Sequence, residues 1–374
     1  MLIMKKYDKE VIQVLLDDEE QILKDLTKNY IKALGGIKQK IKVLLADIET
    51  TQLQSKIYQL QYQQFLEQQI SEYLGILQTG NVKTVEDYLK KCYEDAFIGN
   101  VYSLQQQNIP LVLPIDQTQM IQSVMKPTEG FNFSDRLYDN ISELQKVVKS
   151  EITRGIASQL SYADIARNIS NYSEASMKNA YRIARTEGHR VQNESKMNAM
   201  HTAKKKGADI VKQWDATLDG RTRPNHRQLD GQIRELDEPF EVGGMKVDCP
   251  GGFGIASEDC NCRCCVLQRA RWAVKSEGFH TEYLGKTEYM TDEQLLPKAQ
   301  KLLISVDELR KYGGQIIPIE ATDYKDFCRK YKKIWNYEDF TKRNIVIYFA
   351  MYFCKMYIGS FFKGHKPKKI NWHI

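Results

Sequence analysis

The sequence has little proline, little glycine and no apolar run at its start, and each shortage excludes a class of protein. Nine prolines and 22 glycines among 374 residues exclude a fibrous chain and a wholly disordered one. Because residues 1–10 hold lysines and acidic residues instead of an apolar stretch, we expect no signal peptide. Hydrophobic residues make up 42% of the chain and charged residues 27%, which is ordinary for a globular protein of two or three domains.

The net charge of +6 is modest, but the basic residues are unevenly distributed. Residues 325–374 hold twelve Lys/Arg against three Asp/Glu, whereas the first 324 residues sum to −3. Between residues 182 and 227, eleven Lys/Arg stand against five Asp/Glu. Excess basic charge favours nucleic acid or another anionic surface, although plain solvated surface also explains both stretches. The candidate contacts to double-stranded DNA are Lys204, Lys205, Lys206, Lys330, Lys332 and Lys333.

The spacing of apolar residues predicts an α+β protein: a largely helical N-terminal region, a small β-containing module and a helical C-terminal tail. Apolar residues recur at helical spacing over residues 11–34 and again over residues 41–74, which indicates helical hairpins that pack on each other. The expected domains are a helical hairpin or bundle region at 1–150, the module at 151–275 and a basic, aromatic tail at 276–374.

Several residues are expected to mark helix ends. Gly35-Gly36 is a natural stop for the first helix, and Ser134 is the candidate N-cap of a later one. A long basic helix is expected from Tyr181 to Lys206, ending near Gly207.

The module is expected to open with a strand over residues 210–214. Asp219-Gly220 is typical of the tight turn of a β-hairpin, and sequence rich in Gly, Pro and Asp, with short extended pieces, continues to Cys265. From Val266 onward the pattern returns to helix.

Five of the eight cysteines lie between Cys249 and Cys265. Without a secretion signal we interpret them as reduced thiols or metal ligands. "CNCRCC" places Cys260, Cys262 and Cys264 at alternate positions, and alternate side chains of an extended segment share a face, so these sulfurs would point the same way. Most zinc sites space their cysteines two to four residues apart, but two thiolates at this spacing can hold a soft metal if other ligands come from elsewhere.

Histidine is the usual partner of cysteine in such sites. His189 lies on the expected basic helix, and His226 follows the Asp219-Gly220 turn. A zinc site of His189, His226, Cys262 and Cys264 would join helix, turn and loop, and its binding free energy would add to folding. Two alternatives stay open: reduced cysteines that only pack, and redox or nucleophilic chemistry, which needs an activated thiolate and a positioned third group.

The segment Ile345–Phe362 is strongly apolar and aromatic, with Lys355 as an interruption. Its length approaches that of a membrane span. A buried helix, a weak membrane anchor and a tail that docks on a partner are the open interpretations, of which the buried helix is favoured.

Three stretches, "ARTEGHR", "WDATLDGRTRPNHRQLDGQIRELDEPFEVGG" and "PGGFGIASEDCNCRC", together resemble the phage Mu F-like head-morphogenesis proteins, also called minor head or minor capsid proteins. The resemblance covers about residues 179–273. Because Arg185 and Glu187 stand two apart on a helix, we expect each to pair with a residue outside it. The motif residues that carry the resemblance include Arg185, Glu187, Trp214, Asp219, Arg223, Asp230, Gly231, Asn261 and Arg263.

The resemblance implies a virion protein present in a few copies, bound to the portal in the capsid interior after assembly in the host cytoplasm. It implies capsid or scaffold proteins and packaged double-stranded DNA as further partners. It implies no catalytic activity and no catalytic residue, and it leaves zinc as the one candidate cofactor. The alternative is a metal- or thiol-dependent enzyme, or a toxin-like effector of a prophage.

Overall fold

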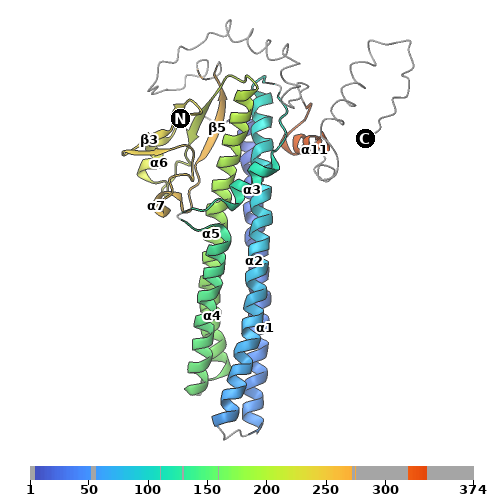
Figure 1. Cartoon of the computed structure of the whole chain (residues 1–374), viewed down its shortest axis with the longest axis vertical. Coiled ribbons are helices and arrows are strands. Elements are labelled where there is room, and N and C mark those ends of the chain that lie inside the picture. The colour runs from blue at the N-terminus through green and yellow to red at the C-terminus, as the bar shows by residue number, and fades with distance from the viewer. Residues whose placement is uncertain are drawn as a thin grey trace, which may run out of the picture.

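Four long helices run side by side along the longest axis of the molecule, and a small β-containing module lies beside one end of them (Figure 1). The helices of this bundle are α1 (Lys6–Thr51), α2 (Lys56–Gln106), α4 (Phe133–Ala157) and α5 (Tyr162–Lys205). The expected fold class, largely helical with a small β module and a helical C-terminal piece, is confirmed. This computed structural model describes residues 5–51, 56–109, 111–128, 130–158, 160–271, 274 and 319–334.

The predicted stop at Gly35-Gly36 is wrong, because α1 continues through both glycines to Thr51. A Cβ atom at Gly36 would collide with the ring of Tyr73 on α2, whereas a Cβ at Gly35 would meet nothing within 4 Å. Gly36 therefore serves the close approach of two helices rather than the end of one.

A buried polar cluster joins three helices of the bundle. The hydroxyl of Tyr30 on α1 lies 2.9 Å from Oγ of Ser176 on α5, and the amide of Asn140 on α4 donates to that same tyrosine oxygen at 3.1 Å. The Asn140 amide also donates to the carbonyl of Ser176 at 3.0 Å. Since unpaired buried polar groups are costly, this cluster selects one alignment of the three helices.

The N-cap of α4 is Asn132, not Ser134 as the sequence suggested. Oδ1 of Asn132 accepts hydrogen bonds from the backbone N–H of Ser134 at 2.9 Å and of Asp135 at 3.0 Å, and the Asp135 carboxylate accepts in return from the N–H of Asn132. This reciprocal arrangement is a capping box. The short helix α3 (Gln117–Met125) lies between α2 and α4 along the chain.

Helix α5 begins at Tyr162 rather than at Tyr181, and Ser161 caps it by accepting from the N–H of Asp164 at 3.2 Å. It ends at Lys205, and Gly207 follows with a φ of 89°, as the glycine predicted. The expected boundary at 150/151 falls inside α4. A boundary at that point would divide a single helix of the bundle.

The module is built on a three-stranded antiparallel sheet in the order β2-β1-β5. Its central strand, β1, confirms the strand expected over residues 210–214, and Trp214 of β1 pairs with Val266 of β5. The expectation of helix from Val266 is wrong, because residues 265–270 pair along the whole of β1. The strands are β1 (Ile210–Asp215), β2 (Ile233–Arg234) and β5 (Cys265–Ala270).

The turn at Asp219-Gly220 does not form a β-hairpin. The N–H of Thr222 donates to the carbonyl of Asp219 at 3.2 Å, but the chain then enters α6 (Pro224–Leu229) before it reaches β2. The hairpin of the module is instead β3 (Phe240–Val242) with β4 (Met245–Val247), and its turn residues Gly243 and Gly244 have φ angles of 56° and 80°. A last short helix, α7 (Ala256–Asp259), precedes the cysteine-rich loop.

In the tail, the described residues form α11 (Tyr324–Ile334), which packs against α2 and α1. Its aromatic side chains Tyr324, Phe327 and Tyr331 are buried. No helix among the described residues has the length and apolar character to cross a membrane. The segment 345–362, with its three open interpretations of buried helix, membrane anchor and docking tail, lies outside the described residues.

Candidate metal centre

Three of the four expected metal ligands come together in the module. His226 is on α6, and Cys262 and Cys264 are on the loop between α7 and β5. Nδ1 of His226 lies 3.2 Å from the sulfur of Cys264 and 3.5 Å from that of Cys262, and the three ligand atoms lie within 4.8 Å of one another. The side chains are 2%, 3% and 6% exposed for His226, Cys264 and Cys262, so the group is shielded from bulk solvent.

Aromatic rings enclose this group. Trp214, fully buried on β1, meets His226 edge to face with ring centroids 5.9 Å apart and meets Phe240 in the same way at 5.3 Å. Phe253 stacks on the His226 ring at 5.5 Å. Such contacts fix the plane of the imidazole.

The far side of the His226 ring faces a carboxylate. Nε2 of His226 lies 3.0 Å from Oε2 of Glu258, although the angle is not that of a good hydrogen bond. The amide of Asn225 donates to the other oxygen of Glu258 at 3.1 Å and so holds the carboxylate in place. A carboxylate behind an imidazole is the arrangement that orients histidine ligands in many metal sites.

The charges of the group favour a thiolate. Hydrogen bonding from Cys264 lowers the pKa of Cys262 against the opposing effect of burial, and the imidazoles of His189 and His226 lower it further. The same hydrogen bond, together with burial, raises the pKa of Cys264. Burial opposes protonation of His226, but the Cys262 sulfur and the Glu258 carboxylate outweigh it and raise the imidazole pKa.

His189, the fourth expected ligand, is not in this three-residue group. Its Nε2 instead contacts the carbonyl oxygen of Cys264 and lies 3.1 Å from the amide nitrogen of Asn193. His189 therefore contacts the backbone of the cysteine-rich loop and not its sulfurs.

The expectation that three sulfurs share a face is wrong for Cys260, which lies outside the group. Asn261 adopts a left-handed conformation with a φ of 53°, which breaks the extended run between Cys260 and Cys262. Beyond the group, the thiol of Cys265 points at the carboxylate of Asp215, 3.7 Å away.

The motif residues hold the loop that carries the two cysteines. Arg263 forms a two-pronged ion pair with Asp219. The guanidinium of Arg223 donates to the carbonyls of Glu258 at 3.0 Å and Cys260 at 2.6 Å. The loop is thus attached on both sides of Cys262 to the turn that precedes α6.

Helix α5 holds the same loop from the other side. The N–H of Asn261 donates to the hydroxyl of Thr186 at 3.3 Å, and the N–H of Val266 donates to Oδ1 of Asn193 at 2.8 Å. Thr186, His189 and Asn193 are spaced three and four residues apart, so they share one face of the helix.

Asp230 and Gly231 fix the segment after α6. The Asp230 carboxylate accepts from the N–H of Ala216 at 2.8 Å, and the N–H of Gly231 donates to the carbonyl of Trp214 at 2.9 Å. Gly231 has a φ of 78°, a value that explains glycine at this position.

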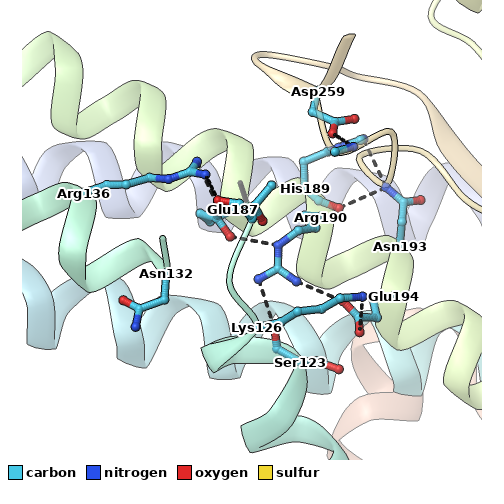
Figure 2. Close-up of polar contacts among 12 residues, drawn as sticks. Ser123, Lys126, Asn132, Arg136, Glu187, His189, Arg190, Asn193, Glu194 and Asp259 are labelled. Atoms are coloured by element: carbon cyan, nitrogen blue, oxygen red, sulfur yellow. Dashed lines mark hydrogen bonds and ion pairs between the residues drawn. The ribbon is translucent and has the colours of Figure 1, made fainter. Parts of the chain in front are cut away.

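Arg185 and Glu187 point in different directions, and both pair outside α5 as expected. Arg185 meets Glu19 of α1 at 2.8 Å. Figure 2 shows Glu187 between two guanidinium groups, those of Arg136 on α4 and Arg190 on α5 itself. The pair with Arg190 lies within the helix, three residues on, and was not foreseen.

The candidate DNA-contacting lysines lie on two elements, the C-terminal end of α5 and α11. Lys204 is paired with Asp237 at 2.6 Å, Lys330 with Asp326 at 2.8 Å, and Lys332 lies 3.6 Å from Asp95. Acidic neighbours therefore offset part of the charge that the sequence count suggested. The remaining three lysines are Lys205 and Lys333, which are exposed, and Lys206, which is half-buried.

No sequence pattern marked Glu258, which lies beside His226, or Arg190, which pairs with Glu187. Glu258 lies 32 positions after His226 and approaches it only because the chain folds back, and no local pattern encodes that return. The 6% exposure of Arg190 is likewise a property of the packed bundle.

Comparison with known proteins finds similarity to the family that the sequence motifs resemble. Residues 146–267 match the family model described as phage Mu protein F like protein. The chain is 34% identical over 267 residues to the NAD(+)--arginine ADP-ribosyltransferase EFV of Enterococcus faecalis (strain ATCC 700802 / V583), which covers 71% of this chain and 55% of that protein. It is 31% identical over 191 residues to the minor head protein GP7 of Bacillus phage SPP1, covering 50% of this chain and 61% of GP7.

The chain thus spans a little over half the length of each of these relatives. No solved structure matches it significantly. The match to residues 146–267 coincides with the part of the structure where α4, α5 and the sheet place the motif residues around one loop. The chain therefore contains a Mu F-like region at residues 146–267, and it is similar over half of its length to a phage minor head protein.

Proposed function

We propose that the chain acts in phage head morphogenesis as a minor head protein, bound at the portal in the capsid interior and contacting packaged DNA. The observation that carries this proposal is the similarity to the minor head protein GP7, which extends over half of the chain. The interior location, the portal as partner and the host cytoplasm as the place of assembly follow from that role, as do contacts with capsid or scaffold proteins.

The shape of the molecule suits a connecting role. The bundle exposes apolar side chains along its length, among them Ile31 (64% exposed), Phe65 (59%) and Ile76 (65%). Exposed apolar side chains mark protein contacts where they form a contiguous patch. Within this proposal we assign the bundle to protein partners.

DNA contact is assigned to the lysines at the end of α5. Replacing Lys204, Lys205 and Lys206 by alanine should weaken binding to DNA of any sequence and lower the slope of log K against log salt by about 0.9 for each phosphate that is no longer neutralised. Lys38, Lys40 and Lys42 on α1 provide a matched triple substitution of equal charge. If both triple variants bind DNA as the unaltered chain does, the lysines of α5 do not contact it.

The experiment that tests the virion role is peptide mass spectrometry on DNA-filled particles purified by density gradient from cells that encode the chain. Peptides of this chain at low copy beside the portal protein are the expected result. Intact particles without them, from lysates that contain the protein, would contradict a virion role.

A second candidate function is ADP-ribosyl transfer, favoured by the relative that bears that name. Incubation of the purified full chain with labelled NAD and an arginine-containing acceptor tests it directly. Transfer of label would establish an enzyme.

A thiol-dependent enzyme is a third candidate, which the Cys–His contact raises. The burial of His226, Cys262 and Cys264 weighs against it, because a nucleophile must be reached by its substrate. A thiol-dependent enzyme is therefore not the function that we propose.

A further inference from the structure

We propose that His226, Cys262 and Cys264 bind one zinc ion, which fastens the cysteine-rich loop to α6. This site differs from the four-residue set that the sequence suggested, since it excludes His189. It does not rest on the virion role, because the site is defined by its own geometry.

The donor set fits a soft or borderline metal. Two cysteine sulfurs and one imidazole nitrogen already lie within 4.8 Å of one another, and zinc–sulfur and zinc–nitrogen bonds of about 2.3 and 2.0 Å span such separations when one ion sits between the ligands. Thiolate and imidazole favour zinc over magnesium or calcium, which prefer oxygen. Zinc is usually four-coordinate, so the three side chains leave one position for a water molecule enclosed with the ion.

The groups around His226 hold its imidazole in the orientation that a metal ligand needs. Nδ1 of His226 faces the two sulfurs, while Nε2 faces Glu258, so the two nitrogens have separate partners. An imidazole that gives its second nitrogen to a carboxylate has a fixed ring orientation and is a better metal ligand. Glu258 acts here as a positioning residue.

The ion would join two segments that are otherwise attached by hydrogen bonds at the loop's edges. The cluster of buried apolar side chains around Trp214 is small and separate from the main core of the bundle. A module with a small core gains much of its stability from a metal, because binding free energy becomes folding free energy.

The zinc content of the full chain, expressed with added zinc and purified with reductant, tests the proposal. We expect about one zinc per chain for the unaltered protein and near none for Cys262→Ser or Cys264→Ser. Cys260→Ser is the matched control, since its sulfur is in the same loop but outside the group, and it should keep its zinc. Zinc-free unaltered protein that is folded by circular dichroism overturns the proposal, as does equal zinc loss in Cys260→Ser.

Cobalt substitution of the unaltered chain covers the case in which the serine variants fail to fold. Co²⁺ should produce the sulfur-to-cobalt charge-transfer absorption of a two-thiolate site. A thiol-reactive mercurial should release the cobalt ion and abolish that absorption. Absence of that absorption in folded, cobalt-treated protein overturns the site. So does a Cys262–Cys264 disulfide found by mass spectrometry in protein purified with reductant.

The role of Glu258 has a separate readout. Glu258→Gln should weaken zinc affinity by about 10- to 100-fold in competition with a chelator, while the helical circular dichroism signal stays unchanged. Glu241→Gln, on β3, is the control and should leave the affinity as it is. Equal affinities of the two variants would refute the positioning by Glu258.

Discussion

Arg263 and Asp219 form a two-pronged ion pair, with Nη1 and Nη2 lying 2.6 and 2.7 Å from the two carboxylate oxygens. The Arg263 guanidinium holds the pKa of the Asp219 carboxyl well below its usual range. Arg263 stands between Cys262 and Cys264 in the sequence. The exposed ion pair with Asp219 therefore holds the loop segment that carries both cysteines.

Asp219→Asn should therefore lower the thermal unfolding midpoint at pH 7. Because the folded-state pKa of Asp219 is depressed, its stabilisation is present above the unfolded pKa of about 4 and is lost as pH falls through the folded value. The difference between variant and unaltered chain should shrink in acid. Glu241→Gln, which breaks the single-pronged pair with Lys246, is the control. A difference that does not depend on pH would contradict this explanation.

A substitution in the buried ion-pair network around Glu187 should lower the stability of the fold more than Asp219→Asn does. Glu187 is 1% exposed and Arg190 6%, and Arg190 also donates to Glu194 at 2.9 Å and to the carbonyl of Ser123 on α3 at 3.0 Å (Figure 2). Arg190→Met should cost about 3–5 kcal/mol of unfolding free energy, because it leaves the buried Glu187 carboxylate without the nearer of its two arginine partners. Denaturant unfolding measures the change.

The paired substitution Glu187→Leu with Arg190→Met provides the check on this cause. Removing both charges should restore much of the loss. If the double variant is as unstable as Arg190→Met alone, lost packing and not the unpaired charge explains the effect. Glu143→Gln breaks an exposed pair on α4 and should change little.

For Asp215 we expect the opposite effect, in which removal of the carboxyl charge raises stability at neutral pH. Burial, with the nearby charge of Asp230, raises its pKa to about 6. A raised carboxyl pKa contributes stability below the unfolded value, which is lost as pH rises through the folded value. Asp215→Asn should therefore be more stable than the unaltered chain at pH 7, by up to about 3 kcal/mol, and similar to it at pH 4.

Denaturant unfolding from pH 4 to pH 7.5 measures that difference. Asp139→Asn, an exposed carboxylate on α4, should show no such trend. A stability gap between Asp215→Asn and the unaltered chain that is constant with pH would argue that the carboxyl is not the cause.

The adjacent glycines of α1 form a matched pair. Gly35→Ala should raise stability by about 0.5–1 kcal/mol, because alanine favours helix and nothing lies within 4 Å of the new Cβ. Gly36→Ala should instead lower the unfolding midpoint, because the Tyr73 ring must move. Equal effects of the two substitutions would mean that α1 and α2 separate easily at this point.

The sequence predicted those parts of the fold that depend on local pattern. Apolar spacing located the long helices, and the strand at Trp214 and the end of α5 near Gly207 were also correct. The prediction at Gly35-Gly36 failed because glycine is used both at helix ends and at close helix crossings, and only the partner, Tyr73, distinguishes the two uses. The prediction after Val266 failed because pairing with β1 decides the conformation of those residues.

For the candidate site, the sequence supplied residue types but not their arrangement. His226, Cys262 and Cys264 were expected together and lie together, whereas His189 was chosen on residue type alone. Its ring contacts the backbone of the loop at Cys264 and not the sulfurs, and neither residue type nor position on a helix predicts which of the two a histidine will contact. The partner of His226, Glu258, depends on the same fold and leaves no trace in spacing.

Helix α5 is a single piece of 44 residues, on the order of 65 Å long at 1.5 Å per residue. Its first half lies among the other long helices, and its second half carries Thr186, His189 and Asn193 against the cysteine-rich loop. An unbroken helix of this length is stiff. A partner that displaced the end of the bundle far from the module would therefore displace the module as well. Force applied at one end of the molecule would reach the other end without any change of fold.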